Sequence, residues 1–169
     1  MVLVNTQLYN SPCGELLLGS VEGKLCLCDW TNSSRAESNR RRVARLLSAD
    51  FVVSGSDVLS TTASQLDEYF AGERREFAIP LLLVGTEFQQ CVWNALLTIP
   101  YGERYTYLCI AHQVGKPKAA RAVAQAIGSN AVSILVPCHR VLGSDGSLTG
   151  YAGGKEAKQC LLDLERVSR

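Results

Sequence analysis

The chain has 169 residues, but only two histidines and one methionine, and no apolar run long enough to span a membrane. Residues 1–7 lack the basic segment and the cleavage site of a secretory signal. The seven cysteines have no regular spacing, which argues against a disulfide framework and favours a reducing compartment. We therefore expect a cytoplasmic protein, or a nuclear one in a eukaryote, without a membrane partner.

Metal ligands are also scarce. Cys26 and Cys28 lie two residues apart and resemble half of a zinc site, but the chain has no second cysteine pair. Its only imidazoles are those of His112 and His139. We expect no metal and no other cofactor, while the sequence leaves the roles of Cys13, Cys26 and Cys28 open.

Acidic residues are absent from one long stretch of the second half. The net charge is only +1, yet residues 1–87 carry eight basic and eleven acidic side chains, and residues 88–169 carry nine and five. Between positions 104 and 144 there is no acid, and the basic residues are Arg104, Lys116, Lys118, Arg121 and Arg140. A local basic face of this kind attracts a phosphate backbone.

The first half reads as a small α/β unit. Residues 15–30 alternate as a β-hairpin around a Glu22-Gly23 turn, residues 40–47 and 64–72 have helical patterns, and residues 77–84 are apolar and extended. The arginines at positions 40, 41, 42 and 45 fit either the solvated face of a helix or, less well, a DNA contact.

The second half is mainly helical. Thr86 and Gln89 form a capping-box pattern before a helix that ends at Pro100. Residues 106–114 and 117–128 predict two short helices with the proportions of a helix-turn-helix. A turn at residues 143–147, a short extended segment at 148–151 and a last helix at 155–167 follow. We predict a boundary between two domains, residues 1–84 and 85–169.

The most informative segment is residues 134–142. Ile134, Leu135 and Val136 predict a short buried strand that Pro137 ends, because proline has no N–H to donate. The next residues are Cys138, His139 and Arg140, and either cation would favour the thiolate. Cys138 is therefore a candidate nucleophile.

Residues 137–141, Pro-Cys-His-Arg-Val, resemble the active-site signature of the O6-alkylguanine-DNA alkyltransferases. Matching blocks extend over residues 88–93, 99–103, 116–123, 128–130 and 149–154, whereas the first half matches only in outline, as at residues 66–72. The resemblance implies a ribonuclease-H-like α/β domain followed by a helical, winged helix-turn-helix-like domain that carries the cysteine. It also implies a monomer that needs no cofactor.

The implied activity is irreversible DNA repair, once per molecule. In this family the thiolate, here Cys138, takes an alkyl group from O6-alkylguanine in double-stranded DNA, and O4-alkylthymine is a further possible substrate. His139 resembles the base that acts through a water, and Glu165 resembles the carboxylate that orients it. Asn130 resembles the hinge between helix and active-site strand.

The resemblance also implies a set of substrate contacts. Arg121 resembles the arginine that fills the stack after the nucleotide is flipped, and Tyr107 the tyrosine that rotates the phosphate. Val141 and Tyr151 would line the guanine pocket beside Ala152, which stands where some relatives have serine. The remaining candidates for contacts with DNA are Lys116, Ala119, Arg140 and Ser144.

Three other functions were weighed. A protein that binds alkylated DNA without transfer would lack the acceptor cysteine, and a Cys-His hydrolase would need an oxyanion hole that no segment indicates. A helix-turn-helix regulator of transcription is the alternative from a different class, although the chain has no room for an additional regulatory domain.

Overall fold

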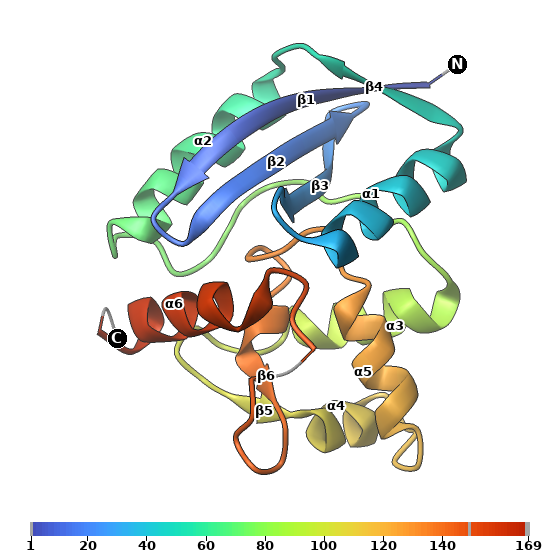
Figure 1. The fold of residues 1–169 in the computed structure, drawn as a ribbon, viewed down its shortest axis with the longest axis vertical. Coiled ribbons are helices and arrows are strands. Elements are labelled where there is room, and N and C mark those ends of the chain that lie inside the picture. The colour runs from blue at the N-terminus through green and yellow to red at the C-terminus, as the bar shows by residue number, and fades with distance from the viewer. Residues whose placement is uncertain (1, 149, 168–169) are drawn as a thin grey trace.

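The first half of the chain forms a four-stranded sheet with two helices, in a computed structural model that describes residues 2–148 and 150–167. The strands are β1 (Val2–Ser11), β2 (Gly14–Val21), β3 (Lys24–Trp30) and β4 (Ala49–Val53), in the order β3-β2-β1-β4. Neighbouring strands are antiparallel except for β1 and β4, which are parallel. Helix α1 (Ser34–Leu47) connects β3 to β4. Figure 1 shows this sheet above the helical half.

The predicted β-hairpin is confirmed. Val21 pairs with Lys24, and the two residues between them, Glu22 and Gly23, have φ values of 51° and 76°. Two consecutive positive φ angles are typical of the tight turns that join twisted antiparallel strands. Strands β1 and β4 were not predicted, since asparagine and glutamine flank the buried Thr6 in β1 and resemble a loop.

Both helices of the first half begin earlier than their apolar patterns indicate. Helix α1 starts at Ser34, where the side chain of Ser33 accepts a hydrogen bond from Ala36 N, and α2 (Asp57–Phe70) starts after Ser56, which accepts one from Leu59 N. The predicted ranges, 40–47 and 64–72, missed the first turns, which the capping serines mark. In α1 these turns are mostly polar, whereas the first turn of α2 contains the apolar Val58 and Leu59.

The second half consists of α3 (Glu87–Leu96), α4 (Tyr107–Gln113), α5 (Ala120–Gly128), the 3₁₀ turn η1 (Cys138–Arg140) and α6 (Gly154–Val167), with a short parallel pair of β5 (Tyr105–Thr106) and β6 (Val141–Leu142). The capping box at Thr86 is confirmed by its two reciprocal hydrogen bonds with Gln89. Helix α5 begins three residues later than predicted, because Ala119 N bonds to Lys116 O in a turn. The turn at residues 143–147 is confirmed by the bond from Gly143 N to Ser147 O, whereas part of the predicted extended segment, Thr149, lies outside the described residues.

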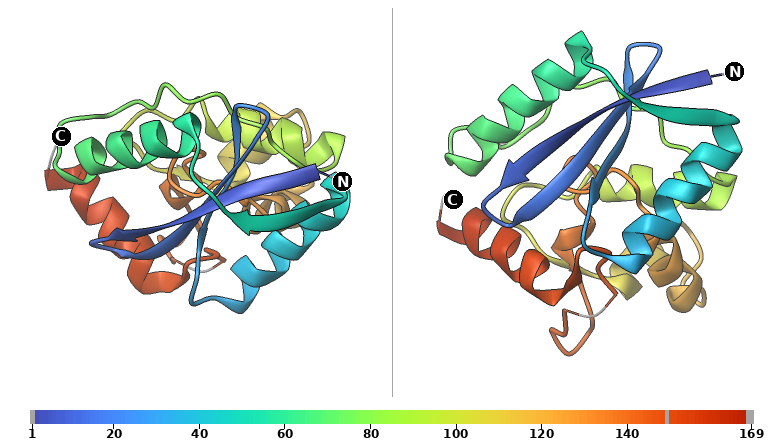
Figure 2. Two further views of the ribbon diagram at one scale, coloured as in Figure 1. Left: turned by 90° about the horizontal axis from the view of Figure 1, so that it is seen from above. Right: turned by 45° about the horizontal axis from the view of Figure 1, so that its top comes forward.

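The two halves share one core. The main apolar cluster joins Leu18 and Leu66 from the first half to Trp93 and Leu161 from the second, all at most 1% exposed. Figure 2 shows α6 lying beside the sheet in both views. The predicted boundary at residues 84 and 85 falls in the segment between α2 and α3 and stays a prediction.

One disulfide, between Cys13 and Cys160, joins the turn after β1 to α6, and the other five cysteines are free. Nothing in the sequence pairs two cysteines so far apart in the chain. Among the described residues, no helix is both long and apolar enough to cross a bilayer.

We expect Leu66→Ala to lower the free energy of unfolding by about 2–5 kcal/mol, because Leu66 is fully buried between α2 and the shared core. Leu46→Ala on α1 is the matched control, since that leucine is 51% exposed and its loss should cost less than about 0.5 kcal/mol. Urea denaturation of the three proteins measures both values, and equal losses would contradict the described core.

Candidate active site

Residues 131–133, which lead to Cys138, run along β3, and the chain then turns back. Cys28 N donates to Ala131 O at 2.8 Å, and Ser133 N donates to Cys28 O at 2.7 Å. The predicted strand at residues 134–136 is wrong, because Ile134 has a φ of 74° and reverses the chain there. A β-branched residue rarely adopts this left-handed conformation, and such strain is most often found at functional sites.

The side chain of Asn130 holds this turn together. Its Oδ1 accepts from Val132 N at 2.9 Å, and its Nδ2 points at Val132 O, Val136 O and Cys138 Sγ at 3.3, 3.1 and 3.1 Å. The resemblance implies only a hinge at this position. The structure instead places the amide in direct contact with the sulfur, where an N–H donor favours the thiolate.

Cys138 opens the 3₁₀ turn η1 and is 2% exposed. Burial raises the pKa of its thiol to about 11, and the donated hydrogen bond of Asn130 and the charge of Lys158 offset this only in part. The prediction that neighbouring cations favour the thiolate is therefore wrong for the resting protein. A base must remove the proton when the thiol reacts.

His139 and Arg140, which follow Cys138 in the chain, both bind Glu165. Nε2 of His139 lies 2.6 Å from Glu165 Oε2, and Arg140 binds both carboxylate oxygens, at 2.9 and 3.0 Å. Arg140 also donates to Ile99 O at 2.7 Å and is 6% exposed. The prediction that Arg140 binds DNA is contradicted, since a guanidinium so enclosed cannot reach a phosphate.

Glu165 accepts two further hydrogen bonds that the sequence did not indicate. The hydroxyl of Tyr69 donates to Oε2 at 2.6 Å, and Gly102 N donates to Oε1 at 3.3 Å. Burial alone would raise the pKa of Glu165, but the adjacent His139 and Arg140 lower it well below its usual range. The carboxylate is therefore ionised although it is buried.

This carboxylate selects the tautomer of His139. An ionised carboxylate only accepts hydrogen bonds, so Nε2 carries the hydrogen that points at Glu165. Burial lowers the pKa of His139, so the ring is neutral near pH 7. Nδ1 then has a free lone pair, and it is buried with no hydrogen-bond partner in the described part of the chain. It is the nitrogen that can accept a proton.

Lys158 is a second residue that the sequence did not indicate. It is 1% exposed, and its Nζ donates to Val141 O at 2.6 Å, the backbone group expected to line the guanine pocket. Burial lowers the pKa of Lys158 to about 8. Its spacing could have indicated that it lies near the site, because Lys158 is seven residues before Glu165 and thus on the same face of α6.

Tyr151 and Ala152 lie close to the cysteine but are covered by the first half. Tyr151 accepts a hydrogen bond from Trp30 Nε1 at 3.3 Å, and the carbonyl of Ala152 accepts one from Ser33 Oγ. Burial and the nearby Cys138 raise the pKa of Tyr151 well above its usual value. Trp30 was not predicted as part of the site, because only the fold brings β3 against residues 150–153.

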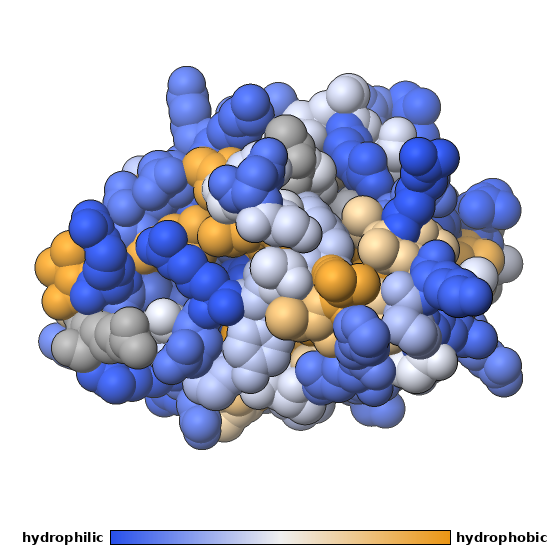
Figure 3. Space-filling model, turned by 90° about the horizontal axis from the view of Figure 1, so that it is seen from below, coloured by the Kyte–Doolittle hydropathy of each residue, from blue (hydrophilic) through white to orange (hydrophobic). Residues whose placement is uncertain are grey.

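The other predicted DNA contacts lie on the outer side of the second half. Lys116, Arg121 and Ser144 are exposed, and Ala119 is half-buried at the start of α5. Tyr107 opens α4, and burial and the nearby Cys138 raise its pKa. Figure 3 shows this side of the molecule, with neutral and apolar side chains across the centre and hydrophilic ones around them.

Two arginines of α1, Arg35 and Arg42, bind the second half of the chain. Arg35 Nε donates to Gly128 O at 2.9 Å, and Arg42 Nη2 donates to Ser129 O at 2.6 Å, both at the end of α5. Cations are favourable there because the carbonyl end of a helix carries partial negative charge. Within the predicted run, Arg41 pairs with Glu37 in solvent, as a solvated helix face implies, whereas Arg42 binds a backbone carbonyl of the second half.

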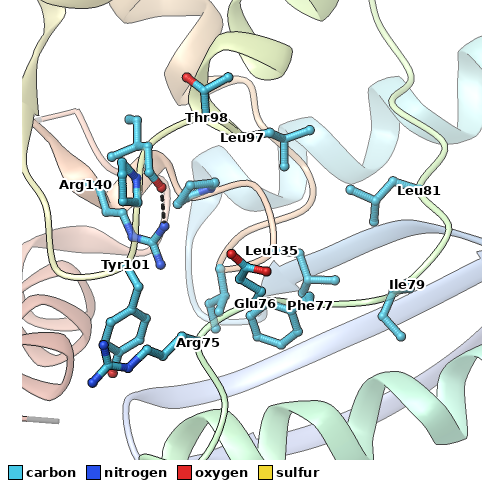
Figure 4. A pocket seen from close by; sticks show the side chains of 14 residues that line it. Arg75, Glu76, Phe77, Ile79, Leu81, Leu97, Thr98, Tyr101, Leu135 and Arg140 are labelled. Carbon is cyan, nitrogen blue, oxygen red and sulfur yellow. Dashed lines mark hydrogen bonds between the residues drawn. The ribbon is translucent and has the colours of Figure 1, made fainter. Parts of the chain in front are cut away.

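A cavity of about 360 Å³ lies behind the cysteine segment, lined on one side by Leu135 and Pro137 and on the other by residues 75–77. In Figure 4, Tyr101 lies between the side chains of Arg75 and Arg140 at its edge. Cys138 is not among the lining residues, so the cavity is not the expected guanine pocket. Within the described ranges, no cluster of three or more potential ligands suits a metal ion.

The chain is similar to known proteins over nearly its whole length. Residues 4–83 match the family model of the 6-O-methylguanine DNA methyltransferase, ribonuclease-like domain, and residues 87–167 match that of the DNA binding domain. The curated methylated-DNA--protein-cysteine methyltransferase of Mycobacterium leprae is 47% identical over 97% of this chain and 93% of its own length. The constitutive protein of that name from Bacillus subtilis is 43% identical over 94% and 93%.

Solved structures agree with these likenesses. The crystal structure of Mycobacterium tuberculosis OGT in complex with DNA has a TM-score of 0.81 and 42% identity, over 98% of this chain and 94% of that one. An archaeal O6-methylguanine-DNA methyltransferase from Pyrococcus kodakaraensis, at 23% identity, shares the fold with a TM-score of 0.73. The predicted architecture, an α/β half followed by a helical DNA-binding half, is confirmed.

Asp29 provides a test of the buried electrostatics beside the site. It is fully buried, and burial raises its pKa to about 8, although the Trp30 N–H and the charges of Arg40 and Arg42 lower it. An unfolded aspartate ionises near pH 4, so between about pH 4 and pH 8 the unfolded chain is charged where the folded one is protonated. The contribution of Asp29 to stability should fall by about 1 kcal/mol per pH unit in this window.

Asp29→Asn should therefore become more stable relative to the parent protein as the pH rises through that window. Urea denaturation at several pH values gives the slopes, and Asp50→Asn, an exposed aspartate of the same half, is the control that should follow the parent. Parallel curves for Asp29→Asn and the parent protein would contradict the raised pKa.

Proposed function

Because the chain belongs to the 6-O-methylguanine DNA methyltransferase family, we propose that it repairs DNA by moving an alkyl group from O6-alkylguanine to its own Cys138. The observation that carries this assignment is the arrangement of three side chains. The buried thiol of Cys138 directly precedes, in the chain, a neutral imidazole whose tautomer is fixed by the ionised Glu165, so nucleophile, base and orienting group are all present.

In the proposed reaction the thiol proton moves to Nδ1 of His139, through a bridging water, as the sulfur attacks the alkyl carbon. One carbon–sulfur bond forms while the bond from that carbon to guanine O6 breaks. The departing guanine anion takes up one proton, which balances the proton lost by the thiol, so the base is released as unmodified guanine. The imidazolium is stabilised by Glu165, and the hydrogen bond from Asn130 stabilises the developing thiolate. The thioether is not cleaved back to the thiol, so each molecule reacts once.

The burial of Cys138 supports extrusion of the nucleotide, because a base stacked in a duplex cannot reach a sulfur that is 2% exposed. In the proposal, Arg121 at the start of α5 fills the gap in the stack, and Tyr107 positions the flipped nucleotide. The carbonyl of Val141 and the ring of Tyr151 would contact the guanine, and Lys116 and Ser144 would contact phosphates.

The proposed partner is double-stranded DNA, as the M. tuberculosis complex with DNA suggests for this chain. The exposed Lys116 and the small Ala119, between α4 and α5, and the exposed Arg121 on α5 suit close approach to a backbone without a sequence-specific contact. We propose that the protein acts as a monomer where the genome lies, in the cytoplasm or, in a eukaryote, the nucleus.

We expect Cys138→Ser to abolish alkyl transfer and to retain DNA binding, because a serine hydroxyl is too weak a nucleophile but alters no contact of α5. The assay follows labelled methyl groups from an O6-methylguanine duplex to protein. Cys109→Ser is the matched control. Hydrogen bonds with Thr106 lower the pKa of the exposed Cys109 thiol and make it more acidic than that of Cys138, yet Cys109 should accept no methyl group, so the control should transfer as the parent protein does. Label retained by Cys138→Ser would overturn the assignment.

We expect Arg121→Ala to slow repair of duplex DNA by about tenfold or more, because unstacking the nucleotide costs a few kcal/mol and the variant lacks the side chain that fills the gap. The reaction with free O6-benzylguanine needs no extrusion and should be nearly unchanged. Lys155→Ala, an exposed cation at the start of α6, is the control for loss of charge alone. Equal losses with both substrates would contradict the role of Arg121.

A further inference from the structure

One hydrogen bond links the first half of the chain to the catalytic carboxylate. Tyr69 lies on α2, is fully buried, and donates its hydroxyl to Glu165 Oε2 at 2.6 Å, across 96 residues of sequence. The same oxygen accepts Nε2 of His139 at 2.6 Å. A single oxygen, Glu165 Oε2, therefore lies between the hydroxyl of Tyr69 and the imidazole of His139, although Tyr69 belongs to the ribonuclease-like half.

The ring of Tyr69 is held in place from several sides. It packs against Phe77 at 5.5 Å and meets Tyr101 edge-on at 6.2 Å between centroids. The guanidinium groups of Arg75 and Arg140 lie 5.3 and 5.6 Å from the centre of the Tyr101 ring. Figure 4 shows the three side chains together. These contacts hold the ring where its hydroxyl donates to Glu165.

We propose that Tyr69 is a positioning residue for alkyl transfer, whose hydroxyl fixes the Glu165 carboxylate against His139, so that the acid–base pair is complete only when both halves are docked. The inference rests on the proposed function and gives the ribonuclease-like half a part in the chemistry. Tyr69 touches neither sulfur nor guanine and acts through Glu165.

The hydrogen bond also sets how strongly Glu165 attracts the imidazole proton. Oε2 shares its charge among three donors, Tyr69, His139 and Arg140. Without the phenol, more of this charge acts on His139, which should raise the pKa of the imidazole. The other titratable or charged groups around this pair stay in place in the variant, namely Cys138, Lys158 and Tyr101.

The test is Tyr69→Phe, which removes one oxygen and keeps the ring contacts. The substrate is free O6-benzylguanine, so that DNA binding does not enter, and the rate of transfer is followed against pH. The control is Tyr9→Phe, the same chemical change in the same half, where the hydroxyl donates instead to Asp67 at 2.7 Å, at an exposed position. Urea denaturation of all three proteins confirms that each is folded under assay conditions.

We expect Tyr69→Phe to react about tenfold more slowly at neutral pH, the usual effect of one hydrogen bond to a charged group. The midpoint of the pH–rate curve of Tyr69→Phe should lie at higher pH than that of the parent, because a more basic imidazole loses its proton at higher pH. Tyr9→Phe should match the parent in both respects. A folded Tyr69→Phe with the parent's rate and pH profile would overturn the inference alone, whereas a parent protein that takes no benzyl group would overturn the proposed function.

Discussion

The site depends on one buried negative charge. Glu165 accepts five hydrogen bonds, from α2, from the backbone at Gly102 and from both residues that follow the cysteine. A carboxylate without these donors could not stay ionised in such a place, because the cost of desolvation would protonate it. With them, the charge fixes the imidazole, closes the turn η1 and joins the two halves of the chain.

A protonated, buried thiol suits a protein that reacts once. A permanent thiolate would react with other electrophiles in the cell. Burial raises the pKa of Cys138 to about 11, so the thiol stays protonated until a base removes the proton. The sulfur is nevertheless ready to lose its proton, because Asn130 already points an amide at it and Nδ1 of His139 is unprotonated. In the proposed mechanism, the extruded guanine adds the last component, which is the alkyl carbon.

The sequence predicts the elements that carry strong local signals, such as the Glu22-Gly23 turn, the Thr86 capping box and the helix that ends the chain. It also predicts His139 and Glu165 as a pair through family resemblance. It places Arg140 on DNA wrongly, since nothing local shows that a buried carboxylate 25 residues away binds its guanidinium. Tyr69 and Trp30 were missed for the same reason, because their partners are set by the packing of two halves and not by spacing along the chain.

The most direct measurement is the intact mass of the protein after incubation with a duplex that carries one O6-methylguanine, followed by peptide mapping. The account predicts a gain of one methyl group, on the peptide that contains Cys138, which stops at one per molecule however much damaged DNA is added. A methyl group on another peptide, or restored guanine with no change in protein mass, would contradict Cys138 as the acceptor. DNA that stays bound and unrepaired would point to a recognition protein instead.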